Sequence, residues 1–146
     1  MLNREYDGQD SCGVAKSLEI LGERWTLLII RDAFFGLRRF EEFQSSLGVA
    51  RNVLTDRLNR LVDEGVFDRR RYSERPERFE YVLTPKGREL IVALTALREW
   101  GDRHVLAHAS LKVRRLDDGK AVTAALVAKG TATVKANEVE LVRRAG

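Results

Sequence analysis

The sequence predicts an α+β protein that is mainly α-helical. Two patterns predict this class. Apolar residues with helical spacing recur through residues 14–64, and the last of these stripes leads directly into an arginine-rich hairpin in residues 66–83. A further helical stripe fills residues 85–108, after which the spacing becomes short and β-like. We therefore expect a mainly helical domain at residues 1–108 and a small β-strand appendage at residues 109–146.

Two short amphipathic helices and one apolar helix are expected first, each ending at a glycine. The apolar faces of the short helices consist of Val14, Leu18 and Leu21 in residues 14–22, and of Phe40, Phe43 and Leu47 in residues 38–48. Between them, residues 24–36 are apolar around most of a helical circumference, so we expect this helix to be buried on several sides. The centre of the domain is expected to hold Trp25, Leu28, Ile29 and Phe35.

The fourth helix carries the pattern of a recognition helix. Leu54, Leu58 and Leu61 share one face, and Gly65 ends the stripe. It follows the third helix after a loop at residues 47–50, which is the length of a helix-turn-helix loop. In that motif the second helix enters the major groove of DNA.

A β-hairpin follows this helix. Phe79, Tyr81 and Leu83 alternate with other residues as in a strand that has one face on a core, and residues 66–72 are its expected partner. Pro76 presets a turn, so the tip is expected at residues 73–78. Four arginines are expected to cluster on the strand and tip: Arg69, Arg71, Arg75 and Arg78. A helix followed by such a hairpin predicts a winged helix-turn-helix.

One long helix is expected next, with Thr84 as its cap, Pro85 in its first turn and its end near His108. It is longer than a small core requires, and we expect it to pack against its copy in a homodimer. The residues expected at that contact are Leu90, Ile91, Leu94, Leu97 and Trp100, with Val92 and Leu106 on a second face. The alternative is that these side chains cover only their own domain. The appendage, with turns at residues 117–119 and at Gly130, is expected to lean on this helix or on a partner chain.

Composition excludes several classes of protein. The only cysteine, Cys12, excludes an internal disulfide or a cysteine-ligated zinc site, and the only histidines, His104 and His108, lack the wider pattern of a metal site, so we expect no metal and no cofactor. No catalytic triad order, phosphate loop or acid cluster appears, so we expect no enzyme. The start of the chain and the lack of an apolar run of about 20 residues predict a cytoplasmic protein without membrane contact.

The net charge of +4 does not itself argue for DNA binding. Residues 1–110 hold 18 basic and 18 acidic residues, whereas residues 111–146 hold 8 and 4. The excess lies wholly in the tail. A DNA interface must therefore rest on the positions of particular arginines.

A set of ordered motifs resembles the HxlR-type winged-helix transcription regulators, which are relatives of the MarR group. The motifs are Cys12-Gly13-Val14, Gly22-Glu23-Arg24-Trp25, Arg31-Asp32, Gly36-x-Arg38-Arg39-Phe40, Leu54-Thr55-x-Arg57-Leu58, Gly65, Glu80-Tyr81-x-Leu83-Thr84-x-x-Gly87 and Trp100-Gly101. The resemblance implies a homodimeric bacterial regulator that acts at the nucleoid on a near-palindromic operator of double-stranded DNA. It also implies that many members answer electrophiles, aldehydes or oxidants. Gly13 replaces the family's usual proline, and Ala50 replaces the serine or threonine that caps the recognition helix, a cap worth ~1 kcal/mol.

The outward face of the recognition helix supplies the expected base contacts. They are Arg51, Asn52, Thr55, Asp56, Asn59 and Arg60. Asn pairs with adenine, Thr contacts a thymine methyl or a phosphate, and Arg51 suits a guanine edge or a phosphate. Asp56 is expected either to pair with Arg60 or to accept from a cytosine amine. The alternative is that these residues only solvate the helix.

Phosphate contacts are expected from the hairpin and from the start of the third helix. Arg75 and Arg78 at the tip would reach phosphates or a minor groove, and Arg38 and Arg39 would anchor the DNA backbone. A module of this fold that binds only another protein is the alternative interpretation. Salt-dependent DNA binding separates the two.

Cys12 is the candidate sensor, because helix N–H groups and the nearby Lys16 would favour its thiolate. An adduct or an intersubunit disulfide there would shift the spacing of two recognition helices about 34 Å apart. The alternatives are a buried, inert cysteine and a noncovalent effector pocket between the long helix and the winged domain.

Overall fold

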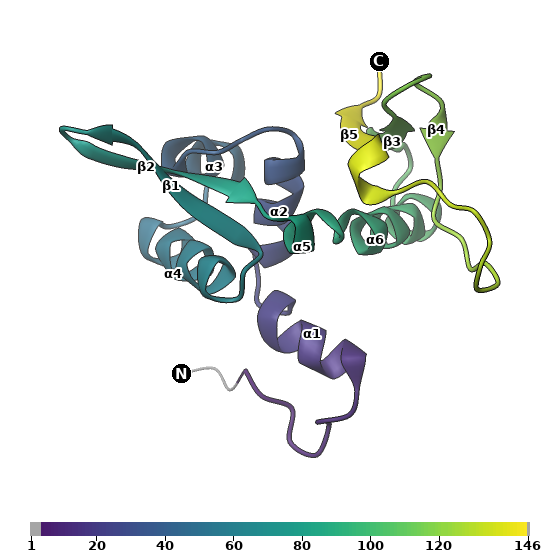
Figure 1. The fold of residues 1–146 in the computed structure, drawn as a ribbon, viewed down its shortest axis with the longest axis horizontal. Helices are drawn as coiled ribbons and strands as arrows, with labels where there is room; N and C mark the ends of the chain where they lie inside the picture. The colour runs from purple at the N-terminus through teal and green to yellow at the C-terminus, as the bar shows by residue number, and fades with distance from the viewer. Residues whose placement is uncertain (1–3, 146) are drawn as a thin grey trace. The chain divides into compact units, whose positions relative to one another are not determined.

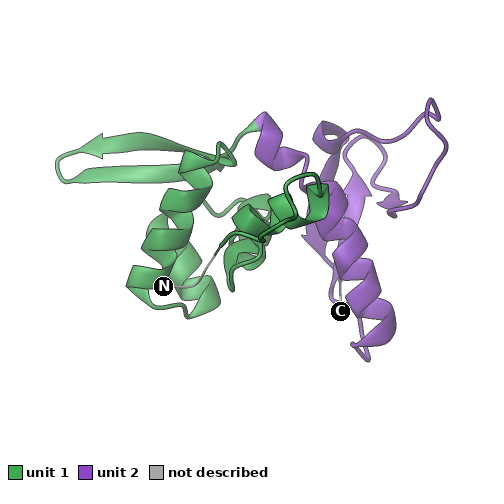
Figure 2. Ribbon diagram, turned by 90° about the horizontal axis from the view of Figure 1, so that it is seen from below, with its two compact units in different colours: residues 1–84 green, residues 85–146 purple. Residues whose placement is uncertain are grey.

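The computed structural model describes residues 4–145, which divide into two compact units between Thr84 and Pro85 (Figure 2). Residues 85–108 were predicted to belong with the winged domain, apart from the strands at 109–146. In the structure the helix of residues 91–104 belongs to the same unit as the strands. None of the helices within residues 4–145 is both long and apolar enough to cross a membrane.

The first unit is a winged helix-turn-helix, as predicted (Figure 1). Its elements are α1 (Gly13–Leu21), α2 (Thr26–Phe34), α3 (Phe40–Leu47), α4 (Arg51–Asp63), β1 (Phe67–Glu74) and β2 (Glu77–Leu83). Gly48, in the turn between α3 and α4, has φ of 65°, a left-handed conformation that glycine adopts without a steric cost. The order of helices and hairpin predicted from the spacing of apolar residues is confirmed.

The core of the first unit gathers around one face of α2, α3, α4 and β1. Its fully buried apolar side chains are Ile29, Ile30, Phe43, Leu54, Leu58, Leu61 and Phe67. The prediction that α2 is buried on several sides is confirmed: Thr26, Ile29, Ile30 and Asp32 are buried, and within the helix only Leu28 is exposed, at 40%. The prediction that Trp25, Leu28 and Phe35 lie at the centre of the domain was wrong, because Trp25 and Phe35 flank the helix and are only half-buried, while its inner face packs on α3 and β2. The apolar face of α1 is also largely exposed, at Val14 and Leu18.

The hairpin is longer than predicted, and its tip is tighter. Strand pairing runs from Phe67↔Leu83 to Glu74↔Glu77, which leaves only Arg75 and Pro76 in the turn. The Ser73 hydroxyl donates to the Pro76 carbonyl at 2.8 Å and closes this turn. The register shifts once, between Arg71 and Ser73.

The second unit holds two helices and a three-stranded antiparallel sheet of order β4-β3-β5. The elements are α5 (Pro85–Arg88), α6 (Ile91–His104), β3 (Leu111–Arg115), β4 (Ala121–Val122), the 3-10 turn η1 (Ala136–Glu138) and β5 (Val139–Arg143). The predicted strand appendage is present, although its second strand is only two residues long. It leans on α6, as expected: Arg98 donates to the Leu111 carbonyl at 3.3 Å, and Thr123 donates to the Glu99 carboxylate at 2.7 Å.

The single helix predicted from Pro85 to His108 is in fact two helices, and the second ends at His104. At the junction the backbone N–H groups of Leu90 and Val92 bond to carbonyls three residues back, at 3.1 and 3.3 Å, which tightens the turn and separates α5 from α6. Gly87, in the first turn, lowers the helix propensity here by ~1 kcal/mol relative to alanine. The Thr84 hydroxyl, which was expected to cap this helix, donates to the Gly65 carbonyl at 2.5 Å.

Candidate nucleic-acid interface

Helix α4 presents one apolar face and one polar face. Leu54, Leu58 and Leu61 are fully buried, which turns the opposite side of the helix outward. Five of the predicted contact residues are exposed on that outer side: Arg51, Asn52, Thr55, Asp56 and Asn59. The sixth, Arg60, is partly buried.

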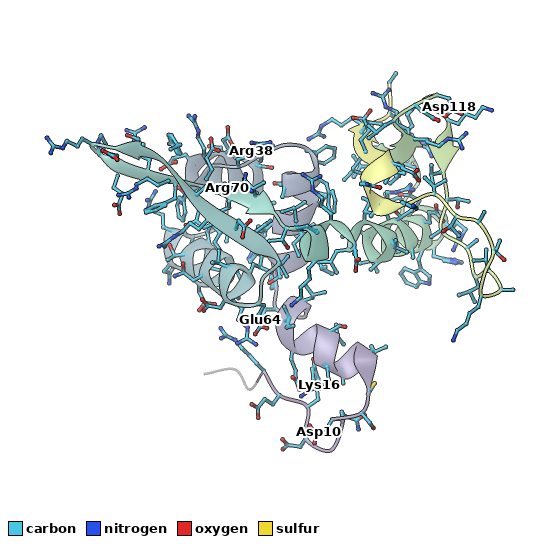
Figure 3. All side chains as sticks on the ribbon, in the orientation of Figure 1. Asp10, Lys16, Arg38, Glu64, Arg70 and Asp118 are labelled. Carbon is cyan, nitrogen blue, oxygen red and sulfur yellow. The ribbon has the colours of Figure 1, made fainter. Side chains whose placement is uncertain are left out.

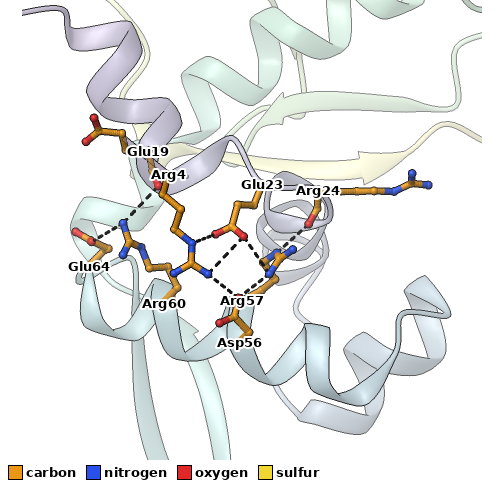
Figure 4. A network of polar contacts seen from close by, with 8 residues as sticks. All are labelled: Arg4, Glu19, Glu23, Arg24, Asp56, Arg57, Arg60 and Glu64. Carbon is orange, nitrogen blue, oxygen red and sulfur yellow. Dashed lines mark hydrogen bonds and ion pairs between the residues drawn. The ribbon is translucent and has the colours of Figure 1, made fainter. Parts of the chain in front are cut away.

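Ion pairs hold one flank of α4 against the segment that joins α1 to α2 (Figure 4). The Arg57 Nη1 atom lies 3.2 Å from Glu23 Oε2, and its Nε donates to the Arg24 carbonyl at 3.0 Å. Arg4 bridges the same carboxylate, at 2.7 Å, and the Asp56 carboxylate, at 3.0 Å. The network therefore fixes the position of α4 relative to residues far away in sequence.

The expected Asp56–Arg60 pair was wrong. Asp56 lies 2.6 Å from Arg57 Nη1, and Arg60 pairs with Glu64 at 3.3 Å and donates to the Glu19 carbonyl at 3.4 Å. The Arg57 guanidinium lies between Glu23 and Asp56, so Arg57 rather than Arg60 pairs with Asp56. Sequence reasoning missed this role of Arg57. The one hint in the sequence was that Arg57 is part of a family motif.

The first turn of α4 lies against α3. Ala50 supplies no side-chain cap, as its side chain predicts. The Arg51 guanidinium donates to Gln44 Oε1 at 3.2 Å and lies 4.6 Å above the ring of Phe40. These contacts orient Arg51 while leaving it exposed.

A cleft of about 680 Å³ separates the start of α3 and α4 from the hairpin. Its lining includes Arg39, Phe40, Arg51, Tyr72 and Arg78. The lining also includes Glu41, Glu42 and Glu77, so its three arginines are matched by three carboxylates. The cleft lies between the polar face of α4 and the hairpin, which is the wing, within the first unit.

The arginines of the wing fall into two groups. Near the base they are held by neighbours: Arg69 lies 4.4 Å above the Phe79 ring, and Arg71 pairs with Glu77 at 3.1 Å. Arg75 and Arg78, at the tip, are exposed, and neither forms an ion pair with another residue of the range 4–145. The cationic side chains at the tip are therefore available to bind a partner molecule.

Sequence reasoning missed Arg70, which lies on β1 (Figure 3) and pairs with Asp68 at 3.6 Å. It lies on the opposite face of the hairpin from Arg69 and Arg71, because successive side chains of a strand alternate. The alternation of side chains along the predicted strand could have placed Arg70 on this face.

Two arginines precede α3. The Glu42 carboxylate accepts the backbone N–H groups of Arg38 and Arg39 at 2.8 and 2.9 Å, and these hydrogen bonds lower the pKa of Glu42. Arg38 is exposed, and Arg39 lies 4.3 Å above the Tyr72 ring of the wing and 3.7 Å from Glu80. The capped turn therefore fixes the backbone from which both side chains project.

Cys12 caps the N-terminus of α1. Its Sγ accepts the Ala15 N–H at 3.4 Å, and the residue is half-buried. Lys16, expected to favour the thiolate, is committed elsewhere: its ammonium lies 2.9 Å from Glu19 and 3.7 Å from Asp10, and the hydrogen bond to Glu19 raises the pKa of Lys16. Lys16 is therefore engaged with carboxylates, and the hydrogen bond to the Cys12 sulfur comes from the start of the helix.

The apolar residues of α6 differ in exposure. Leu97 and Trp100 are 54% and 55% exposed, and Trp100 lies beside His104 with ring centroids 5.4 Å apart. Val92 and Leu106 are also exposed, and Leu90 and Leu94 are half-buried. Ile91 is only 3% exposed. Within residues 4–145 no group of three or more His, Cys, Asp and Glu side chains is placed to hold a metal.

Comparison with known proteins finds a matching family and similar regulators. The family model for HxlR-like helix-turn-helix proteins matches residues 20–109. An uncharacterised HTH-type transcriptional regulator of Mycobacterium tuberculosis is 48% identical over 104 residues, which cover 71% of this chain and 64% of that protein. The chain thus spans slightly less than two thirds of the length of this relative.

Solved structures agree with the fold. The crystal structure of the transcription factor PA1607 is 43% identical, with a TM-score of 0.73 over 84% of this chain and 87% of that chain. The transcriptional regulator YodB of Bacillus subtilis, in its reduced form, is 28% identical, with a TM-score of 0.57 over 66% of this chain and 97% of that chain. A diamide-treated form of YodB is also similar. The named relatives are regulators rather than enzymes.

Proposed function

Because the chain belongs to the HxlR-like helix-turn-helix family, we propose that it is a transcriptional regulator that binds double-stranded DNA as a homodimer, at the nucleoid in the bacterial cytoplasm. One observation supports DNA binding above the others. The exposed polar face of α4 lies across a cleft from a wing whose tip carries Arg75 and Arg78, two exposed arginines that form no ion pair within residues 4–145. A major-groove helix beside a cationic wing is the arrangement by which this fold binds duplex DNA.

The residues divide into base contacts and phosphate contacts. Asn52, Thr55 and Asn59 are exposed on the outer face of α4 and suit base edges, while Arg51, held beside Phe40, suits a guanine or a phosphate. The phosphate contacts are assigned to Arg38, Arg39, Arg69, Arg71, Arg75 and Arg78. Asp56 and Arg60 support the position of α4, since both are engaged in ion pairs.

A simple contrast tests this division. Arg75→Ala should weaken binding to all sequences alike, because phosphates carry no sequence information. Asn52→Ala should instead change the preferred base at one position of the site. The measurement is fluorescence anisotropy with a near-palindromic fragment from upstream of the gene and with variants of it. Equal losses on all fragments for both variants would contradict the assignment of Asn52.

The homodimer is supported by the exposed apolar side chains of α6. Leu97 and Trp100 would be costly to leave in water, and a second copy would cover them. Val92, although exposed, lines a cleft of the second unit and is left out of the contact. Leu90 and Leu94 lie at the margin of this surface, whereas Ile91 is buried within its own chain and is left out of the contact.

The signal is proposed to act at Cys12. Two Cys12 thiols, one from each copy, would lose two protons and two electrons to an oxidant and form an intersubunit disulfide. The similarity to YodB, for which reduced and diamide-treated structures exist, supports a thiol response. A noncovalent effector is the competing proposal, and a response that persists without the thiol would favour it.

A further inference from the structure

The second unit contains a cleft of about 450 Å³ between α6, the sheet and the segment 122–139. This volume falls in the range of ~300–1,000 Å³ that is typical of small-molecule sites. The cleft lies wholly within the second unit, so it is separate from the proposed DNA interface.

The cleft has an aliphatic lining. Its floor is formed by Ile91, Thr95 and Val113, each at most 5% exposed. Valines and alanines continue up its walls, including Val122, Ala132 and Val139, and no aromatic ring lies among the described residues that line it. Such a surface suits a flexible alkyl chain, which binds by removing its methylene groups from water.

The polar side chains of the cleft differ in whether they can contact a ligand. The Thr95 hydroxyl donates to the Ile91 carbonyl at 2.6 Å, and the Thr123 hydroxyl donates to Glu99 at 2.7 Å. Their protons are thus committed to the protein. Lys135, exposed at the rim, is the single charged side chain among the described residues that line the cleft.

We propose that this cleft binds a small aliphatic carboxylate, with its alkyl chain on the floor and its carboxylate at Lys135. Charge complementarity at Lys135 supports the acid. The carboxylate beside the lining, that of Glu99, accepts hydrogen bonds from the Thr123 hydroxyl and the Ala124 N–H. The inference does not depend on DNA binding, and its test uses binding alone.

The test is calorimetric titration of the full chain with sodium octanoate, sodium decanoate and sodium acetate, below their micelle concentrations. One octanoate should bind per chain, with a negative heat-capacity change from apolar burial. Affinity should rise about fourfold with each added methylene, so decanoate should bind more tightly and acetate should not bind measurably. Absence of octanoate and decanoate binding would overturn the proposal.

Two variants locate the site, each with a matched control on the same segment. Ala132→Phe should fill the cleft and abolish binding, whereas Ala128→Phe, at an exposed alanine outside the lining, should not. Lys135→Met should weaken octanoate binding about threefold and leave octanol binding unchanged, and Lys129→Met should alter neither. Circular dichroism checks that each variant folds.

Two results would overturn the proposal even if octanoate binds. One is binding that Ala132→Phe leaves unchanged, which would place the ligand elsewhere. The other is a pair of findings: Ala132→Phe no longer self-associates, and Lys135→Met binds octanoate as tightly as wild type. Together they would mean that a second copy fills the cleft.

Discussion

The Arg57 guanidinium lies 3.2 Å from the Glu23 carboxylate, and both side chains are only 13% exposed. This pair connects the middle of α4 to the residues just before α2. Because the pair is largely shielded from water, loss of Arg57 would leave the Glu23 carboxylate with Arg4 as its remaining partner and would remove the hydrogen bond to the Arg24 carbonyl. This is more costly than breaking a surface pair.

Arg57→Leu should lower the free energy of unfolding by about 2 kcal/mol. In a double-mutant cycle with Glu23→Gln, the two changes should couple by about 1 kcal/mol, as residues in one network do. Urea unfolding, followed by circular dichroism, measures both quantities. Arg24→Leu is the control, because that exposed side chain points away from the network (Figure 4). Additive effects of the two changes would contradict the coupling.

Stability should also depend on the ionisation of Glu42. Backbone hydrogen bonds from Arg38 and Arg39 lower the pKa of this carboxylate in the folded protein. The contribution of Glu42 to stability is therefore present above its unfolded pKa of about 4.3 and is lost as the pH falls through the folded pKa.

Glu42→Gln should thus destabilise the protein more at pH 7 than at pH 3. Unfolding by urea across this pH range checks the prediction, with Glu41→Gln as the exposed neighbour that serves as control. A difference from wild type that stays constant across the range would refute the linkage.

Self-association should depend on the exposed face of α6. Trp100→Glu should shift the protein from dimer to monomer at micromolar concentration, since a charge would have to be buried in the contact. Sedimentation velocity measures this. Leu126→Glu, which alters a fully exposed leucine outside the helices and strands, should leave the dimer intact. A dimer that survives the Trp100 change would require a different contact surface, for example the exposed face of α1.

An oxidant response should require Cys12, the only cysteine of the chain. Diamide should alter the affinity of the wild type for its operator and leave Cys12→Ser unaffected, and nonreducing electrophoresis should detect a disulfide-linked dimer only in the wild type. If Cys12→Ser responds like the wild type, the thiol is not the sensor.

The features that depend on local spacing could be predicted from the sequence. The buried stripe of Leu54, Leu58 and Leu61 and the following hairpin are periodic patterns, so their element types could be assigned without a structure. The contact between Asp56 and Arg4 could not be predicted, because the two residues are 52 positions apart in sequence and only the tertiary fold brings them together.

The break between α5 and α6 was missed for a related reason. No proline marks it, and the apolar spacing continues across Leu90, so only the change in hydrogen bonding at Leu90 and Val92 reveals it. Exposure was equally hard to predict: Leu28 and Ile29 are neighbours in an apolar run, yet only Ile29 faces the core.

Salt-dependent DNA binding by an Arg51/Arg75/Arg78 triple alanine variant tests the central claim most directly. The control replaces Lys120, Lys129 and Arg144 by alanine, which removes the same charge from the basic tail. The triple variant should bind the operator fragment at least roughly tenfold more weakly than wild type, and its salt dependence should fall by about 0.9 in log–log slope for each phosphate that the variant no longer neutralises. The tail control should bind nearly as wild type does. Equal binding by the triple variant and the wild type would contradict the assignment of α4 and the wing as the DNA interface.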